Sequence, residues 1–197
     1  LLSFSPELFF RLDGRRLTAR PMKGTATRGA DPADDDARAA ALRADPKNRA
    51  ENLMITDLLR NDFSRVADDV QVPALFSIER YPTVLQMTST ITAAARPGVT
   101  AADVLTAMFP CGSVTGAPKI RAMEVIAAVE PEPRGVYTGS IGAIAANGDA
   151  LFNVAIRTLV LPAGAGTARL GLGSGIVADS AAADEWQECL AKAAFLT

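Results

Sequence analysis

The sequence predicts an α+β protein in which antiparallel β-sheet packs against helices. Two dipeptides with strong turn preference, Asp13-Gly14 and Asn147-Gly148, each lie between runs that are typical of strands, which indicates two β-hairpins. Between these hairpins, apolar residues at helical spacing predict a helix within 47–66, and a Gly-Ala-Pro entry indicates another at 117–129. Strands linked as hairpins, with helices grouped between them, are typical of the α+β class.

The first half of the chain is predicted to begin with two strands within 7–20, around the turn at Asp13-Gly14. Residues 31–48 are acidic, rich in alanine and bracketed by prolines, so we expect a loop with one short exposed helix. The segment 83–94 is rich in β-branched residues and is predicted to be a strand. An amphipathic helix is predicted within 47–66 from its apolar residues, Leu53, Met54, Leu58 and Leu59.

The second half is predicted to contain three helices, at 100–108, at 117–129 after a Gly-Ala-Pro entry, and at 180–196 with Ser180 as the N-cap. Three strands are expected between the second and third of these helices, near 136–146, 150–161 and 167–178. We find no internal repeat and no linker, so a single domain is expected.

Composition narrows the class of protein. Of the 197 residues, 49% are apolar and 21% are charged, as in folded soluble proteins, and the net charge of −2 gives no basis for binding nucleic acid or an acidic membrane. Apolar runs are too short to cross a membrane, and the N-terminus lacks the features of a signal peptide. The two cysteines, Cys111 and Cys189, have no metal-like spacing. Since two cysteines make a disulfide framework improbable, we expect a protein of the reducing cytoplasm.

Histidine is absent from the chain. This excludes Ser-His-Asp hydrolases, zinc sites with histidine ligands and an imidazole general base. Proton transfer and metal binding must therefore use carboxylates, Lys, Tyr, Cys or water.

The glycine-rich stretch GLGSGIVADS, 171–180, is interpreted as an anion-binding loop. Gly171, Gly173 and Gly175 superficially resemble a dinucleotide loop, but the βαβ context and the following acidic residue of that fingerprint are missing. Bare backbone N–H groups before a helix can instead bind an anion.

Carboxylates on the last predicted helix have two interpretations. Glu185 and Glu188 are three residues apart, and Lys192 follows four residues after Glu188 on the same face. This spacing fits a solvated Glu–Lys pair, or a Mg²⁺ site, since that ion prefers oxygen ligands. Glu51 could complete such a site, or it could simply compensate the dipole of its own helix.

Arg157 is predicted to lie on a strand among apolar residues. A charge there needs a partner, so a buried ion pair or an anionic ligand is expected, and a carboxylate would fit the guanidinium fork. Tyr137, on the preceding predicted strand, could add a hydroxyl donor or be an ordinary half-buried tyrosine.

A series of distinctive motifs runs along nearly the whole sequence, in the order SPELFF, PMKGT, AENLMITDLLRNDFSRV, FPCGSVTGAPKIRAMEVI, YTGSIGAI, IRTL and GSGIVADSAAADEWQECLAKA. In these motifs and in their order, the chain resembles the chorismate-utilising enzymes, the family of anthranilate, isochorismate and aminodeoxychorismate synthases. The resemblance implies that 1–197 is a chorismate-binding catalytic domain, a sandwich of antiparallel sheets and helices.

The resemblance also implies a role for each matching residue. Glu51, Glu185 and Glu188 would bind Mg²⁺, which in turn holds the ring carboxylate of chorismate. Glu7 would be the general acid that protonates the departing 4-hydroxyl. The implied substrate-binding residues are Tyr137 and Arg157 for the enolpyruvyl carboxylate, Lys192, Gly173, Ser174 and Gly175 for the ring carboxylate, and Ser113, Thr115, Gly116 and Gln86 as further contacts.

Lys23 would select the reaction within the family. Anthranilate synthase-like members carry Ala here, whereas P-x-K-G-T resembles the aminodeoxychorismate branch, in which the lysine attacks C2 of chorismate and ammonia then adds at C4. Ammonia would come from glutamine through an amidotransferase partner. An ammonium is not a nucleophile, so desolvation or a cationic neighbour, such as Arg20 or Arg28, must favour the amine; the alternative is a structural or solvated lysine.

Two departures from the family pattern leave other readings open. Many members have His where this chain has Gln86, which can form hydrogen bonds but cannot transfer a proton at neutral pH. Family large subunits are about twice as long, so we expect the chain to begin inside the catalytic domain, without the N-terminal subdomain. The alternatives are anthranilate or isochorismate synthesis, or an inactive chorismate-binding fragment or scaffold.

Overall fold

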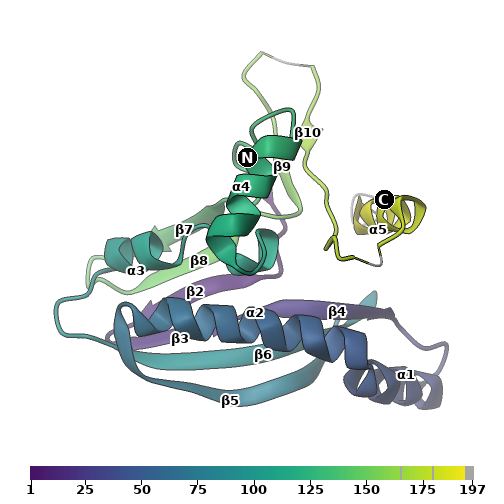
Figure 1. Cartoon of the computed structure of the whole chain (residues 1–197), viewed down its shortest axis with the longest axis horizontal. Helices are drawn as coiled ribbons and strands as arrows, with labels where there is room; N and C mark the ends of the chain where they lie inside the picture. The colour runs from purple at the N-terminus through teal and green to yellow at the C-terminus, as the bar shows by residue number, and fades with distance from the viewer. Residues whose placement is uncertain (165, 179, 194–197) are drawn as a thin grey trace.

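The computed structural model describes residues 1–164, 166–178 and 180–193. Its body is an antiparallel sheet of seven strands (Figure 1). The strands β4 and β3 pair with successive parts of one edge of β6, and β5 pairs with the opposite edge. The sheet continues from β3 through β2 and β8 to β7. A smaller sheet has the order β1-β9-β10. The strands are β1 (Leu2–Ser3), β2 (Leu8–Asp13), β3 (Arg16–Arg20), β4 (Met22–Thr27), β5 (Ala67–Arg80), β6 (Val84–Ala95), β7 (Ser140–Ile144), β8 (Ala150–Val154), β9 (Thr158–Val160) and β10 (Arg169–Leu170).

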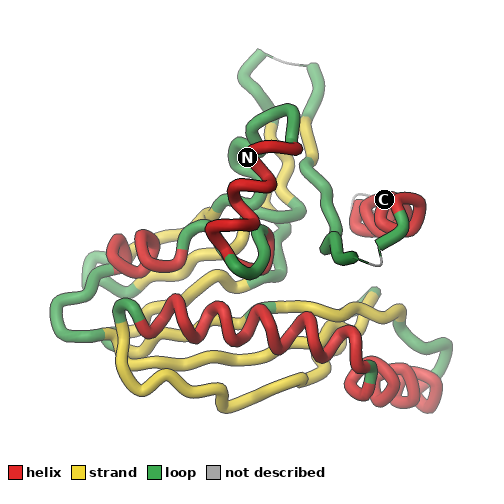
Figure 2. The backbone as a smooth tube through the Cα atoms, viewed as in Figure 1, coloured by secondary structure: helices red, strands yellow, loops and turns green. Residues whose placement is uncertain are grey.

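Helices lie along the sheet and above it (Figure 2). They are α1 (Pro32–Ala44), α2 (Pro46–Ser64), α3 (Ala101–Met108), the short 3₁₀ helix η1 (Gly112–Val114), α4 (Lys119–Val129) and α5 (Ala182–Ala193). Asp31 and Asp45 cap α1 and α2, each followed by a proline at the start of its helix. A capping box between Thr100 and Asp103 begins α3. The starts of α1, α2 and α3 are therefore encoded locally, whereas α4 begins after Pro118 without a side-chain cap.

The main core lies between α2 and the sheet. Ile55, Leu59 and Phe63 of α2 pack with residues of β2, β3 and β6, whose fully buried members are Phe9, Phe10, Leu17, Ala19 and Ile91. Complete burial of one such large apolar side chain contributes about 1.5–3 kcal/mol. A second cluster joins Leu42 of α1 to Phe76, Leu85 and Met87. Both helices are thus packed on the sheet, and Asn48 in the first turn of α2 lies against Gly24 of β4.

The predicted fold class is confirmed, as are the first hairpin, α2, β6, α3 and α4. Several details were wrong. Residues 31–48 contain the 13-residue helix α1 rather than a short helix in a loop, and β4 and β5 were not predicted. The buried face of α2 includes Ile55, while Leu53 and Met54 are exposed.

The predicted strands 150–161 and 167–178 are shorter in the structure. Arg157 adopts φ +47 and separates β8 from β9, and only Arg169–Leu170 of the last segment pairs as a strand. The last helix begins at Ala182, and Ser180 is not its N-cap, because the Ser180 hydroxyl bonds to Val177 and Glu185. Residues 194–196 of the predicted helix lie outside the described residues. No described helix combines the length and the apolar character needed to span a membrane.

Candidate active site

The carboxyl group of Glu7 is buried directly before β2. Only 5% of the residue is exposed, and its carbonyl accepts a hydrogen bond from the Val154 N–H at 3.1 Å. Burial raises the pKa of this carboxyl, against the opposing effects of a Ser113 hydrogen bond and the charges of Lys23 and Lys192. The structure therefore brings four predicted site residues from β4, η1, α5 and the start of β2 into one neighbourhood. A carboxyl with a raised pKa can keep its proton toward neutral pH and act as an acid.

Cys111 belongs to the same neighbourhood and was not predicted. It is buried, its Sγ lies 3.2 Å from the Ser113 Oγ, and burial together with the Glu7 charge raises the pKa of the thiol to about 12. The thiol therefore stays protonated and is a neutral, compact neighbour of the acid. The sequence shows a cysteine two residues before Ser113, but nothing in the sequence indicates that it lies close to Glu7.

Lys23 and Lys192 lie along the glycine-rich loop. A Cβ placed on Gly175 would lie 3.6 Å from the Lys23 Nζ, so the amine lies against the backbone of the loop. The Lys192 Nζ donates to the Gly173 carbonyl at 2.9 Å and pairs with Glu188 at 2.6 Å. The glycine loop is thus placed where two cationic groups and its own backbone can meet an anion.

Tyr137 lies over the same loop. It is in the turn before β7, not on a strand as predicted. A Cβ on Gly171 would come within 2.3 Å of its ring and one on Gly173 within 2.6 Å of its hydroxyl, which excludes larger residues at both positions. Burial raises the pKa of Tyr137, so its phenol remains a hydrogen-bond donor.

Arg157 lies in a bend between β8 and β9, also not on a strand as predicted. Its carbonyl accepts a hydrogen bond from the Phe4 N–H, and its left-handed φ of +47 is unusual for a residue with a side chain. The guanidinium is half-buried and makes no hydrogen bond or ion pair with any residue in the described part of the chain. An ion pair with a residue of 1–164, 166–178 or 180–193 is therefore not formed, and an anionic ligand stays a prediction.

The segment 111–116 forms a rigid wall beside Glu7. The Thr115 Oγ1 donates to the Cys111 carbonyl at 3.0 Å, closing the turn around η1. Gly116 has φ +142, and a Cβ there would lie 3.1 Å from Ala122. Arg134 donates to the Val114 carbonyl at 2.8 Å and ties this wall to the turn that carries Tyr137. Of the three predicted contacts here, Ser113 faces Glu7, whereas the Thr115 hydroxyl is used within its own turn.

Gln86 points its amide at β4. Its Nε2 donates to the Gly24 carbonyl at 2.8 Å, and its Oε1 accepts from the Thr25 Oγ1 at 3.0 Å. Asn52, which was not predicted, lies fully buried on α2 and donates weakly to the Lys23 carbonyl at 3.4 Å. A polar residue in helical register with Ile55 and Leu59 was the signal in the sequence that could have identified it.

Three carboxylates were predicted to bind Mg²⁺, Glu51 on α2 and Glu185 and Glu188 on α5. The Ser174 and Ser180 hydroxyls hold the pKa of Glu185 below its usual range, and the Glu185 Oε2 is buried without a hydrogen-bond partner. Carboxylate oxygens suit a hard cation, and this orphaned oxygen could accept one. Glu188 is instead paired with Lys192, and among the described residues no three His, Cys, Asp or Glu side chains are grouped as a cation site. The magnesium site stays a prediction.

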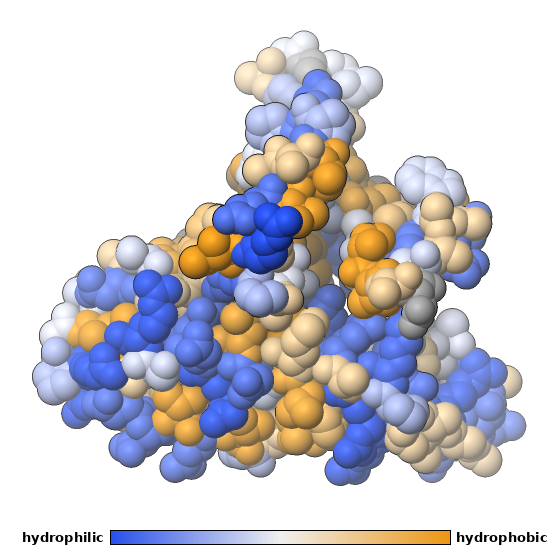
Figure 3. Space-filling model, in the orientation of Figure 1, coloured by the Kyte–Doolittle hydropathy of each residue, from blue (hydrophilic) through white to orange (hydrophobic). Residues whose placement is uncertain are grey.

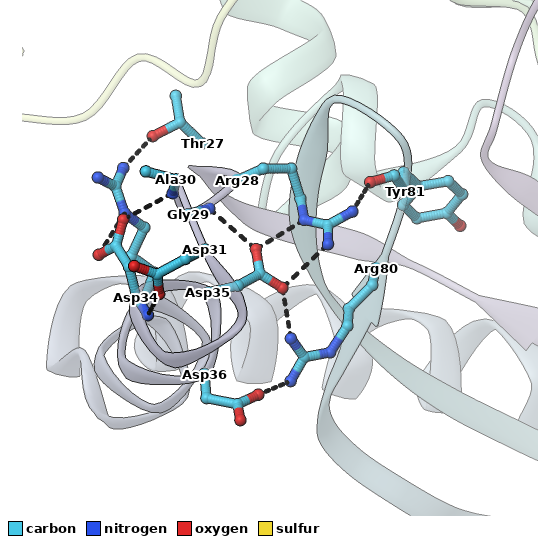
Figure 4. A network of polar contacts seen from close by, with 11 residues as sticks. Thr27, Arg28, Gly29, Ala30, Asp31, Asp34, Asp35, Asp36, Arg80 and Tyr81 are labelled. Atoms are coloured by element: carbon cyan, nitrogen blue, oxygen red, sulfur yellow. Dashed lines mark hydrogen bonds and ion pairs between the residues drawn. The ribbon is translucent and has the colours of Figure 1, made fainter.

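The two arginines considered as cationic neighbours of Lys23 are engaged elsewhere. Arg20 pairs with Glu79 at 3.2 Å, and Arg28 pairs with Asp35 at 2.7 Å while donating to the Tyr81 carbonyl (Figure 4). Arg28 and the Gly29 N–H, with Arg80, hold the pKa of Asp35 well below its usual range. These ion pairs join α1 to the ends of β4 and β5. Lys192, like Lys23, acts electrostatically on Glu7, so the two lysines share this carboxyl as a neighbour.

Comparison with known proteins places this site in a family. The family model for the chorismate binding enzyme matches residues 1–197. The aminodeoxychorismate synthase component 1 of Klebsiella aerogenes is 47% identical over 194 residues, which cover 98% of this chain and 43% of that protein. The anthranilate synthase component 1 of Streptomyces coelicolor is 44% identical, with 98% of this chain and 38% of that protein covered.

A solved structure agrees with these relatives. The anthranilate synthase component I from Streptococcus pneumoniae superimposes with a TM-score of 0.83 at 36% identity, covering 98% of this chain and 42% of that one. The chain therefore spans less than half the length of the relatives named here. With a matching family model along its whole length, the chain belongs to the chorismate binding enzyme family.

Proposed function

We propose that this protein is the chorismate-binding catalytic part of an aminodeoxychorismate synthase, which converts chorismate and ammonia to 4-amino-4-deoxychorismate and water. The observation that carries the proposal is the position of Lys23, whose amine lies against Gly175 and within the electrostatic field of the buried acid Glu7. A nucleophile and an acid beside one anion-binding loop are the groups that the reaction requires.

Substrate binding would use the cationic and donor groups around the loop. Arg157, without an ion-pair partner in the described part of the chain, and the Tyr137 phenol would bind the enolpyruvyl carboxylate. Lys192 and the backbone of Gly173, Ser174 and Gly175 would bind the ring carboxylate, and Ser113, Thr115 and Gly116 would form the adjoining wall. Mg²⁺ bound by Glu51, Glu185 and Glu188 would neutralise the charge of the ring carboxylate.

The chemistry would proceed in two substitutions. The neutral Lys23 amine forms a bond to C2 of chorismate while the C4–O bond breaks, and Glu7 supplies the proton with which the hydroxyl leaves as water. Ammonia then bonds to C4, the C2–N bond breaks, and the lysine amine is regenerated. A carboxyl that stays protonated because it is buried is suited to the first step, since hydroxide is a poor leaving group.

Ammonia would be supplied from glutamine by an amidotransferase subunit. The Klebsiella relative is named component 1, which fits a two-component enzyme. The substrates are small and soluble, so we propose a cytoplasmic enzyme of para-aminobenzoate and folate synthesis that binds neither nucleic acid nor membrane.

A product assay tests the reaction and its rivals. The complete gene product, incubated with chorismate, Mg²⁺ and an ammonium salt, should form 4-amino-4-deoxychorismate. Anthranilate as the main product would instead assign the protein as an anthranilate synthase. This is the leading alternative, because the chain is 44% identical to an anthranilate synthase component. Isochorismate formed without ammonia would indicate the third reaction of the family. Chorismate binding without turnover would indicate a non-catalytic scaffold.

Intact-mass measurement tests the covalent step. With chorismate but no ammonia, the protein should gain the mass of chorismate less one water, and peptide mapping should place the gain on Lys23. Lys23→Ala should abolish the adduct, whereas Lys47→Ala, which removes an exposed lysine of α2, should retain it. An adduct that persists in Lys23→Ala would refute the role of this lysine.

A further inference from the structure

Lys23 lies in a β-bulge. Met22 pairs with Thr88 and Thr25 pairs with Gln86, so the two residues Lys23 and Gly24 of β4 stand opposite the single residue Met87 of β6. Bulges bend a strand and redirect its side chains, and they are frequent next to active sites. Here the redirected residue is the proposed nucleophile.

Glycine is required in this bulge for two reasons. Gly24 has φ +92, which residues with side chains rarely adopt, and a Cβ there would lie 3.0 Å from the Asn48 Oδ1 and 3.1 Å from the Asn48 Cβ. The first turn of α2 therefore packs directly on the bulge. The Asp45 side chain holds Asn48 by accepting hydrogen bonds from its backbone N–H and its Nδ2, at 2.7 and 2.8 Å.

Two side-chain amides bind the two carbonyls of the bulge. The Gln86 Nε2 donates to the Gly24 carbonyl at 2.8 Å, and the Gln86 Oε1 is itself held by the Thr25 hydroxyl at 3.0 Å. On the α2 side, the Asn52 Nδ2 donates to the Lys23 carbonyl at 3.4 Å, and the Asn52 Oδ1 accepts from the Ser89 Oγ. Met87 lies on the same face of β6 as Ser89, which bonds to Asn52 of α2. Because neighbouring residues of a strand point to opposite faces, Gln86 reaches the bulge from the other face of the sheet.

The Gln86 bond is the stronger of the two. A donor–acceptor distance of 2.8 Å is near the optimum, whereas 3.4 Å lies at the weak end of the range. Gln86 is largely buried, so removing its donor would leave the Gly24 carbonyl without this bond, and the bulge could relax toward regular pairing. Such relaxation would rotate the Lys23 side chain.

We propose that Gln86 is a positioning residue for Lys23, which holds the bulge so that the amine stays beside Gly175 and Glu7. The inference rests on the proposed function. Both polar atoms of the Gln86 amide are bound to β4, so this role needs no proton transfer, in keeping with a chain that has no histidine. It differs from a substrate-binding role, which would use the remaining Nε2 proton.

Substitution of Gln86 distinguishes these roles in the complete gene product. Gln86→Met keeps the length of the side chain and removes both hydrogen bonds, and Thr25→Val removes only the hydroxyl that orients the amide. Thr90→Val, on the same strand but paired with Ala74 of β5 and away from the bulge, is the control. The measurements are the rate of Lys23 adduct formation at saturating chorismate and the dissociation constant of chorismate.

A misplaced reacting group costs up to about 100-fold in rate, so Gln86→Met should slow adduct formation by about 10-fold or more and leave the dissociation constant within about threefold. Thr25→Val should cause a smaller slowing, and it serves as the test if Gln86→Met does not fold. A dissociation constant weakened by about 10-fold with an unchanged saturated rate would overturn the proposal in favour of substrate binding. Unchanged values in both variants would overturn it as well.

A second measurement does not depend on the reaction. Limited acetylation with acetic anhydride, followed by peptide mass spectrometry, gives the reactivity of Lys23 relative to the exposed Lys47. This ratio should change by about threefold or more in Gln86→Met and stay constant in Thr90→Val. A constant ratio in Gln86→Met would refute the positioning role. If the natural protein forms no chorismate adduct, the proposed function fails, and the acetylation ratio still decides the role of Gln86.

Discussion

At the scale of single residues, the burial of Glu7 has a cost in stability and, under the proposed function, provides the acid of the reaction. Burial disfavours its charged form, and this raises the pKa of the carboxyl despite two nearby lysines. The folded state therefore binds a proton at Glu7 more tightly than the unfolded chain does. The stability from this protonation is present below the ordinary pKa of 4.5 and is lost as the pH rises through the raised pKa of the folded state.

Glu7→Gln should separate the two effects. A neutral amide removes the cost of ionising a buried group, so the variant should gain melting temperature relative to the natural protein at about pH 8, and the gain should shrink toward the ordinary pKa of Glu. The amide cannot supply a proton, so turnover should fall by about 10²-fold or more. Thermal scans and product assays across this pH range measure both. A stability difference that is independent of pH would contradict the ionisation argument.

Sequence resemblance named residues that the fold brings together, whereas local sequence patterns did not group them. Glu7, Lys23, Ser113 and Lys192 were named from motifs, and the fold brings them together although they come from four separate elements. Cys111 and Asn52 were not named, because each acquires a role only through a partner far along the chain. Arg157 was predicted to lie on a strand, since its sequence neighbours are apolar and nothing in the sequence reveals its left-handed φ.

At the scale of elements, α2 was predicted correctly as a helix, but the prediction of which residues it buries was partly wrong. Leu53 and Met54 are exposed, and the buried face carries the polar residues Asn52 and Thr56 beside Ile55 and Leu59. Hydropathy alone favours the leucine and methionine, whereas the sheet offers hydrogen-bond partners, such as the Ser89 hydroxyl, to the asparagine. Burial of a polar group is acceptable when its bonds are satisfied, and this depends on tertiary structure.

Two alanine substitutions on α2 test this face. Ile55 is 2% exposed and Leu53 is 50% exposed. Ile55→Ala should lower the free energy of unfolding by about 2–5 kcal/mol because it leaves a cavity in the core. Leu53→Ala should change it by only about 0.5 kcal/mol. Urea denaturation of both variants measures the difference, and equal effects would contradict the observed face of the helix.

The strands β4 and β5 were missed for a related reason. The pairing of β5 with β6 shifts register three times, and Asp69 and Phe76 of β5 have positive φ, so the alternation that identifies a strand is interrupted. In β4 the bulge at Lys23-Gly24 has the same effect. Bulges remove the two-residue period from the sequence while the strand itself persists, so periodicity could not predict either strand.

Helix α1 is joined to the sheet by the Asp35 ion pairs (Figure 4). Since Arg28, Gly29 and Arg80 lower the pKa of Asp35, its contribution to stability is present above the ordinary pKa of Asp and is lost as the pH falls toward the lowered value. Asp35→Asn should therefore lower the melting temperature at neutral pH, and the difference from the natural protein should narrow in acid. The control Asp57→Asn, in an exposed pair on α2, should have little effect at any pH.

At the scale of the whole molecule, apolar side chains remain on the surface over α4 and α5. No residue of α4 is buried, and Ile120 and Val129 are 76% and 69% exposed. On α5, Trp186 and Leu190 are exposed. Apolar surface is visible on the side of the molecule that carries these helices (Figure 3). Large contiguous apolar patches are rare on soluble monomers and favour association.

The 197-residue chain, expressed by itself, should therefore self-associate and bind a hydrophobic dye such as anilinonaphthalene sulfonate. Combining Ile120→Lys with Val129→Lys places charge at two exposed apolar positions of α4 and should reduce both the association and the dye fluorescence. Arg121→Gln with Glu124→Gln, two exposed polar residues of the same helix, should leave both unchanged. Light scattering after size-exclusion chromatography measures the mass across a range of concentrations. A single monomeric species without dye binding would show that these side chains cover one another in solution, which would contradict their exposure in the structure.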